Sequence, residues 1–164
     1  LWVSGQLDET RYGPPDPFFV RADGLSTAYR RETGWRRSIY VQQPRFNSVT
    51  TLDLFDYPQM NPNCVNRPHS TVVSQALHLL NDSTIRQLAD SLVERVRSKV
   101  GDNIQSQIEH VYQIALSRSP TPEERQISLG FFRRSRARMP DAGRRVLSKF
   151  CHTVFNSAAF TYID

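Results

Sequence analysis

Residues 82–100, DSTIRQLADSLVERVRSKV, carry the clearest helical pattern in the chain. Apolar side chains recur there every three or four positions, which is the spacing that places them on one face of a helix. These apolar positions are Ile85, Leu88, Ala89, Leu92 and Val96. Asn81 or Asp82 stands just before them and can accept the first free backbone N–H groups. The segment therefore predicts a long helix with one buried face.

The same spacing recurs on both sides of this segment and predicts a mainly α protein. We expect a five-helix bundle over about 71–156, preceded by an irregular N-terminal third with short extended segments. The expected helices lie near 71–81, 84–100, 103–117, 122–139 and 142–156. The expected core consists of Leu77, Leu88, Leu92, Ile108, Val111, Tyr112, Phe131, Phe150 and Val154.

The fourth predicted helix has the strongest start signal. Thr121 and Glu124 have the spacing of a capping box, in which each side chain accepts the other residue's backbone N–H. Pro122 stands at the first helical position, where its missing N–H costs nothing. We therefore expect this helix to begin at Pro122, and its apolar positions Ile127, Phe131 and Phe132 to lie along it up to about residue 139.

The N-terminal third, residues 1–70, reads as loop-rich. Proline and glycine pairs mark turns there, and only residues 18–21 and 38–41 favour short extended runs. Residues 53–68 read as an ordered loop, because three prolines each exclude the helical region for the residue before them.

Residues 1–5 read either as the last turn of a helix closed by Gly5 or as a short ordered coil. The first alternative indicates that residues 1–164 are the C-terminal part of a single larger domain. In that case we expect Trp2, Val3 and part of residues 38–45 to pack against a segment outside this chain.

The composition is that of an ordinary globular domain and excludes a membrane-spanning helix in this chain. The 164 residues are 23% charged and 38% hydrophobic, and no apolar run approaches the roughly 20 residues that a membrane helix needs. No initiator Met and no signal segment are present.

The formal net charge of +5 comes largely from arginines near the C-terminus. These form either a solvated helical face or a candidate anion-binding surface made of Arg133, Arg134, Arg138, Arg144 and Arg145.

Such a surface would suit an anionic glycan or an acidic protein. Nucleic acid is not expected, because no nucleic-acid-binding motif accompanies the arginines. No metal-binding spacing and no C-x-x-C-H haem attachment motif is present, so we expect no metal and no cofactor in this segment. Cys64 and Cys151 either form a disulfide or remain two buried free thiols.

Chemically interesting side chains are few, and no catalytic set emerges. Around the start of the first predicted helix, polar residues border an apolar run and lie next to a proline-rich loop. They either line a polar pocket or tether the loop to the helix by hydrogen bonds, since buried polar groups near irregular backbone usually satisfy that backbone. This candidate set is Asp56, Arg67, Thr71, Gln75 and Asn81.

Several short runs together resemble a known family. They are Ser4-Gly5, Leu7, Gly13-Pro14, Arg37-Ser38-Ile39-Tyr40, Phe55-Asp56-Tyr57-Pro58, Asn63-Cys64, Arg67, Ser70-Thr71, residues 75–81 (QALHLLN), Ala115-Leu116, Arg118, Pro120-Thr121, Glu124, Asn156-Ser157, Phe160, Tyr162 and Asp164. The resemblance is to a domain of unknown function that closes large extracytoplasmic planctomycete proteins, which often begin with a cytochrome c-like domain. Tyr12 departs from it, because a glycine is expected at that position.

The resemblance implies a context and no chemistry. It implies a periplasmic or secreted multidomain protein, with a signal peptide upstream and haem c possible in an upstream domain. The family has no established activity, so no catalytic residue carries over. We therefore expect a non-catalytic structural or docking module of a cytochrome c-associated protein whose partner is the upstream segment. The alternative is part of an extracytoplasmic enzyme acting on glycan or another polymer, with Asp56, Arg67 and Gln75 at the rim of a site that upstream residues complete.

Overall fold

The computed structural model describes residues 1–43, 49–57, 73–138 and 143–161. These residues belong to two compact units. The loop unit is Gln6–His78, and the helical unit is Leu1–Gly5 together with Leu79–Asp164. The chain is mainly helical with a short N-terminal hairpin, as the sequence predicts. Within the described residues, no helix is both long enough and apolar enough to cross a membrane.

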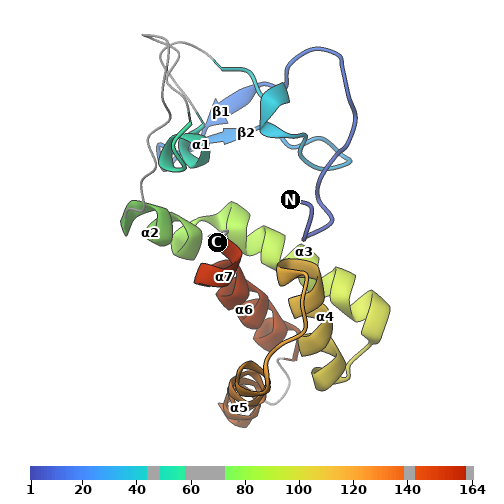
Figure 1. Ribbon diagram of the computed structural model, residues 1–164. Coiled ribbons are helices and arrows are strands. Elements are labelled where there is room, and N and C mark those ends of the chain that lie inside the picture. The colour runs from blue at the N-terminus through green and yellow to red at the C-terminus, as the bar shows by residue number, and fades with distance from the viewer. Residues whose placement is uncertain (44–48, 58–72, 139–142, 162–164) are drawn as a thin grey trace. The chain divides into compact units, whose positions relative to one another are not determined.

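The helical unit contains the predicted bundle (Figure 1). Its helices are the end of α2 (Val73–Asn81), α3 (Ser83–Val100), α4 (Ile104–Leu116), α5 (Pro122–Arg138), α6 (Gly143–Phe155) and the short α7 (Ala158–Thr161). Helix α6 packs against α3, α4 and α5, so it forms the centre of the unit. Each of the five predicted helices is present, with bounds within two residues of the predicted ones wherever the chain is described.

The caps follow the predicted chemistry. Asp82 accepts the backbone N–H groups of Thr84 and Ile85 at the start of α3, and Asn103 accepts that of Ser106 at the start of α4. At α5, Glu124 N–H donates to Thr121 Oγ1 at 3.2 Å and Thr121 N–H donates to Glu124 Oε2 at 2.8 Å. The predicted capping box is therefore confirmed.

Most of the predicted core is buried: Leu88, Leu92, Ile108, Val111, Tyr112, Phe150 and Val154. The predicted apolar face of α5 is only partly buried. Phe132 faces inward together with Ser128, whereas Ile127 is exposed and Phe131, predicted to be buried, is half-buried against Phe132 and Phe150. Ser128 can occupy an inward position because its hydroxyl donates to the carbonyl of Glu124 one turn earlier.

Leu77 was also predicted to be buried and is instead 52% exposed. Helix α2 buries Gln75 and His78 in its place. Gln75 Nε2 donates to the carbonyl oxygen of Leu54 at 2.7 Å, and His78 Nε2 lies 2.9 Å from Thr51 Oγ1. Both partners belong to the short helix α1, Thr50–Leu54: Leu54 offers a carbonyl at the C-terminal end and Thr51 a hydroxyl in the first turn. These two hydrogen bonds turn Gln75 and His78 inward and leave Leu77 exposed.

The loop unit contains an antiparallel hairpin, β1 (Phe18–Val20) paired with β2 (Ser26–Ala28). The sequence predicted the first strand and missed the second. The predicted extended run at residues 38–41 was wrong for residues 38–40, because η1 (Ser38–Tyr40) is a 3-10 turn in which the Tyr40 N–H donates to the carbonyl of Arg37. Val41 is extended, as predicted, and pairs with Asp16. Helix α1 was likewise not predicted, since residues 53 and 54 were read as loop.

Residues 1–5 form a turn that ends at Gly5, where φ is +71°. Gly5 N–H donates to the carbonyl of Trp2 at 3.0 Å, as a left-handed closing glycine does. Arg95 of α3 donates to the carbonyls of Trp2 and Val3 and stacks on the Trp2 ring at 5.1 Å. The Trp2 side chain is nevertheless 59% exposed.

Candidate functional site

Two parallel backbone bridges frame the first part of the loop unit. Leu7 pairs with Trp35, and Asp16 pairs with Val41. Asp8 N–H donates to the carbonyl of Trp35 at 2.8 Å, and Asp16 N–H donates to that of Tyr40 at 2.7 Å. The chain segments between the bridges, residues 8–15 and 36–40, are therefore tied together at both ends.

The first bridge depends on Gly34, whose φ is +127°. A Cβ atom at this position would lie 2.3 Å from the carbonyl oxygen of Gln6, which is far inside van der Waals contact. Only glycine allows this close approach of the two segments.

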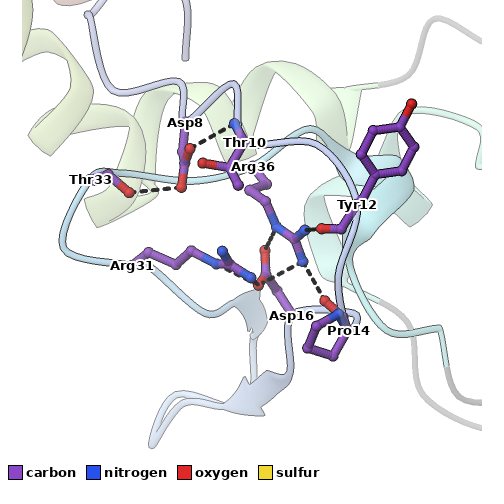
Figure 2. Close-up of polar contacts among 8 residues, drawn as sticks. All are labelled: Asp8, Thr10, Tyr12, Pro14, Asp16, Arg31, Thr33 and Arg36. Atoms are coloured by element: carbon purple, nitrogen blue, oxygen red, sulfur yellow. Dashed lines mark hydrogen bonds and ion pairs between the residues drawn. The ribbon is translucent and has the colours of Figure 1, made fainter.

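A buried ion cluster joins the two segments between the bridges (Figure 2). Arg36 is 2% exposed and Asp16 is 3% exposed. Arg36 Nε donates to Asp16 Oδ2 at 2.7 Å, and its Nη2 donates to Oδ1 at 3.0 Å. Arg31 reaches the same Oδ1 with its Nε at 2.8 Å. Asp16 thus sits between two guanidinium groups and is kept ionised.

The remaining donors of Arg36 reach across to the other segment. Its Nη1 donates to the carbonyl of Tyr12 at 2.9 Å, and its Nη2 donates to that of Pro14 at 2.6 Å. The ring of Tyr40 lies 4.6 Å from the guanidinium carbon, which adds a cation–π contact. One side chain therefore fixes the path of residues 12–16 by binding two of its backbone carbonyls and the Asp16 carboxylate.

The pKa values of these groups follow from their contacts. Asp8 accepts hydrogen bonds from the backbone of Thr10 and from the hydroxyl of Thr33. Hydrogen bonds from the side chains of Thr10 and Thr33, together with that from the Thr10 backbone, lower the pKa of Asp8 to about 2. Burial works to raise the pKa of Asp16, but the hydrogen bonds from Arg36 and Arg31 outweigh it, so this pKa is lowered as well. Asp16 in turn raises the pKa of Arg36. Neither aspartate holds a proton that it could give to a substrate at neutral pH.

A cavity of about 360 Å³ lies beside this cluster within the loop unit. Its lining comes from the two bridged segments: Asp8, Glu9, Thr10, Arg11, Tyr12, Arg37, Ile39 and Tyr40. Tyr12 and Ile39 are each 82% exposed, which is far more than large apolar side chains usually show. In Figure 2 the ring of Tyr12 points away from the ion cluster, while its carbonyl faces Arg36.

Tyr12 also has an unusual backbone, with φ at +66°. This left-handed region costs an L-residue roughly 1–2 kcal/mol and is normally occupied by glycine. The turn therefore keeps the conformation of the glycine expected there, although a tyrosine occupies it. Strain of this kind persists where the surroundings hold the residue in place, here through the bond from Arg36 to the Tyr12 carbonyl.

The sequence-predicted polar set is only partly described. Arg67, Thr71 and Cys64 lie outside the described residues. Gln75 is buried and binds the end of α1 through its bond to Leu54, which is the geometry of a tether. Asp56 follows α1 with φ at +56°, and Asn81 is the exposed last residue of α2.

The predicted arginine surface is divided between two places in the helical unit. Arg133 and Arg134 line a shallow groove along α5 together with Ile127 and Gly130. Arg138 and Arg145 are exposed, and Arg144 pairs with Glu94 of α3 at 2.7 Å. Cys151 is a free, fully buried thiol of α6, and burial raises its pKa to about 12. Among the described residues, no group of three His, Cys, Asp or Glu side chains is placed to hold a metal.

Sequence reasoning missed Asp8, Asp16, Arg31 and Arg36. Asp16 stands before Pro17 and reads as an ordinary turn residue, and Arg36 is one of many arginines. Their 20-residue separation leaves no local spacing that could have linked them. The one local signal was the departure at position 12, where a glycine is expected and Tyr12 adopts a left-handed backbone.

The comparison with curated proteins and that with solved structures each found no match. The model of one family, described as PSD1, protein of unknown function (DUF1553), matches residues 1–132. The resemblance to a domain of unknown function is thereby confirmed. Since this match covers 132 of the 164 residues, the chain belongs to the DUF1553 family.

Proposed function

We propose that this chain is a non-catalytic docking module of a secreted or periplasmic multidomain protein. The protein would be of the planctomycete type that carries a cytochrome c-like domain, with haem c bound upstream and none in this segment. The module's partner would be the segment that precedes it in the full-length protein. The observation that carries this proposal concerns the two buried carboxylates beside the cavity of the loop unit, Asp8 and Asp16. Both are fully engaged in hydrogen bonds and ion pairs with other side chains and the backbone.

The buried carboxylates at this cavity support a structural role. Both oxygens of Asp16 bind guanidinium groups, and both oxygens of Asp8 accept hydrogen bonds from threonines. Groups so fully engaged fix the two segments in place and are poor general acids or bases. The side chains that the two bridged segments expose to solvent at this cavity include two large apolar ones, Tyr12 and Ile39.

Exposed apolar anchors beside a rigid polar frame are typical of a binding surface. Interface energy concentrates in a few large side chains that fill pockets, and tyrosine is among the most common of these. A rigid backbone also lowers the entropy lost on binding. Ile39 lies in η1, and the bond from Arg36 holds the Tyr12 carbonyl, so the backbone under both anchors is fixed.

The test is calorimetric titration of residues 1–164 with the separately expressed upstream segment. Ile39→Asp and Tyr12→Asp should each weaken binding by about tenfold or more, because a charge replaces an anchor at the interface. Val20→Asp is the matched control, since Val20 is 57% exposed in β1 and does not line the cavity. If all three variants bind as the wild type does, this cavity is not the docking site.

The second candidate is part of an enzyme acting on glycan or another polymer, completed by upstream residues. The observation that favours it is Glu9, an exposed carboxylate in the same cavity as the rings of Tyr12 and Tyr40. Its nearest cation, Arg37, lies 3.7 Å away. In that case Glu9→Gln would abolish turnover of the full-length protein while leaving assembly intact. The docking proposal expects no effect of Glu9→Gln beyond a small change in affinity.

A further inference from the structure

A second cavity, of about 240 Å³, lies inside the helical unit. It is lined where the end of α3, the start of α4, the inner side of α5 and the start of α6 meet. One water molecule needs only about 10–15 Å³ of such space, so the cavity has room for a larger polar group. None of its lining residues belongs to the cavity of the loop unit.

Three arginines from three helices line this cavity: Arg97 of α3, Arg136 of α5 and Arg144 of α6. Arg97 Nη2 binds Asp102 Oδ1 at 2.8 Å, and Arg144 Nε binds Glu94 Oε1 at 2.7 Å. These bonds orient two of the guanidinium groups before any ligand arrives.

Arg136 differs from the other two. It makes no ion pair and no hydrogen bond with any residue that the structure describes. Asp102 also lines the cavity, and Glu94 pairs with Arg144 from outside its lining, so three cations are balanced by two carboxylates and one positive charge is left over. A buried floor increases the effect of this charge, because Phe132, Leu147 and Gln107 are each at most 5% exposed and keep water from one side.

The start of α6 adds to the same field. Gly143 lines the cavity, and a Cβ atom built on it would meet no described atom within 4 Å, so the α6 backbone leaves space on this side of the cavity. Within the described part of the chain, the first turn of α6 contains no acidic residue, so the positive end of the helix dipole adds to the potential there.

We propose that this cavity binds a phosphate or sulfate group. Guanidinium groups match tetrahedral oxyanions in charge and can donate two parallel hydrogen bonds to them. Arg136 supplies the uncompensated charge, and Arg97 and Arg144 supply donors that are already oriented. The arginines on the outer side of α5, Arg133 and Arg134, lie in a separate groove and contribute only to the long-range field.

The experiment is a titration of the 164-residue protein with inorganic phosphate and, separately, with inorganic sulfate at constant ionic strength. Backbone amide NMR shifts would report the binding. The wild type should show saturable shifts at the first turn of α6 and at the end of α3 with at least one of the two ions. The ion that binds more tightly indicates whether a phosphorylated or a sulfated compound is the source of the group.

Arg136→Ala should weaken this binding by roughly tenfold or more, since a bond to a charged donor is lost. Arg136→Lys should recover part of the affinity, because the charge returns without the planar fork. Arg133→Ala removes the same charge from the other groove and should change the affinity by less than about threefold. Arg136 is exposed, so its loss should leave the melting temperature without ions unchanged.

Equal binding by the wild type and Arg136→Ala would overturn the proposal. So would an equal loss in Arg133→Ala, because that result would assign the binding to the general positive field. Absence of saturable shifts with both ions would overturn it as well.

Discussion

Arg36 holds both carboxylate oxygens of Asp16, with 2.7 Å from Nε to Oδ2 and 3.0 Å from Nη2 to Oδ1, while both side chains are shielded from solvent. A buried pair of this kind is worth little compared with apolar residues of the same shape, but it is costly to break. Its effect here is geometric, because Arg36 also holds the carbonyls of Tyr12 and Pro14. The pair thereby shapes the edge of the proposed docking cavity.

Asp16→Ala should destabilise the loop unit by about 3–5 kcal/mol, because it leaves two guanidinium groups without their shared carboxylate. Urea unfolding followed by tryptophan fluorescence would measure this, since Trp35 lies on the neighbouring bridge. Glu9→Ala serves as the control, because the exposed pair of Glu9 with Arg37 should contribute at most about 1 kcal/mol. A loss for Asp16→Ala no larger than that for Glu9→Ala would contradict the structural role of the pair.

Leu92→Ala should destabilise the helical unit by about 2–5 kcal/mol, because Leu92 is completely buried and its truncation leaves a cavity. Leu77→Ala is the matched change on α2, where the leucine is 52% exposed, and it should cost far less. Denaturant unfolding of both variants measures the difference. Equal losses would mean that the covered face of α2 is assigned wrongly.

Glu124 should give the stability of α5 a marked acid dependence. The bonds from Arg118 at 2.7 Å, together with that from the Thr121 backbone, lower the pKa of Glu124 from 4.5 to about 2. A lowered folded-state pKa means that the stabilisation is complete above pH 4.5 and is lost as the pH falls towards 2. The stability difference between wild type and Glu124→Gln should therefore be largest at neutral pH and shrink over this window.

The control for this titration is Thr121→Ala. Its hydroxyl accepts the N–H of Glu124 and does not titrate, so removing it should cost about 1 kcal/mol at neutral pH and still cost stability at pH 2. A difference between wild type and Glu124→Gln that is the same at both ends of the window would rule out the shifted pKa.

Tyr12→Gly should make the protein more stable and a weaker binder. Glycine relieves the left-handed strain, worth about 1 kcal/mol, while the variant loses the exposed ring. Thermal unfolding measures the gain, and titration with the upstream segment measures the loss. A variant that gains stability and binds normally would show that the Tyr12 ring takes no part in docking.

The helices were predictable because their signals are local. The apolar stripe from Leu88 to Val96 and the capping box at Thr121 both involve residues only one to three turns apart. The spacing of residues along the chain is therefore enough to predict these helices. On α5 the burial of Ser128 was missed, because its hydroxyl donates to the helix backbone and an apolarity pattern does not reveal this. The burial of Leu77 was predicted wrongly for a related reason: the hydrogen bonds of Gln75 and His78 to α1 turn these polar residues inward instead.

The ion cluster of the loop unit could not be predicted from periodicity or local motifs. Its defining contacts join residues about 20 positions apart through segments without regular structure, so no periodicity connects Asp16 to Arg36. The arginine surface was predicted as one patch because spacing along the chain does not show which way each side chain points. The structure places Arg133 and Arg144 in different grooves.

Hydrogen–deuterium exchange of the full-length protein, compared with that of residues 1–164 alone, tests the docking proposal most directly. A docked upstream segment would exclude solvent from the cavity edge, so backbone amides at residues 8–12 and 37–40 should exchange more slowly in the full-length protein. The β1–β2 hairpin should exchange equally in both. Equal exchange at residues 8–12 and 37–40 in the two proteins would contradict the proposal.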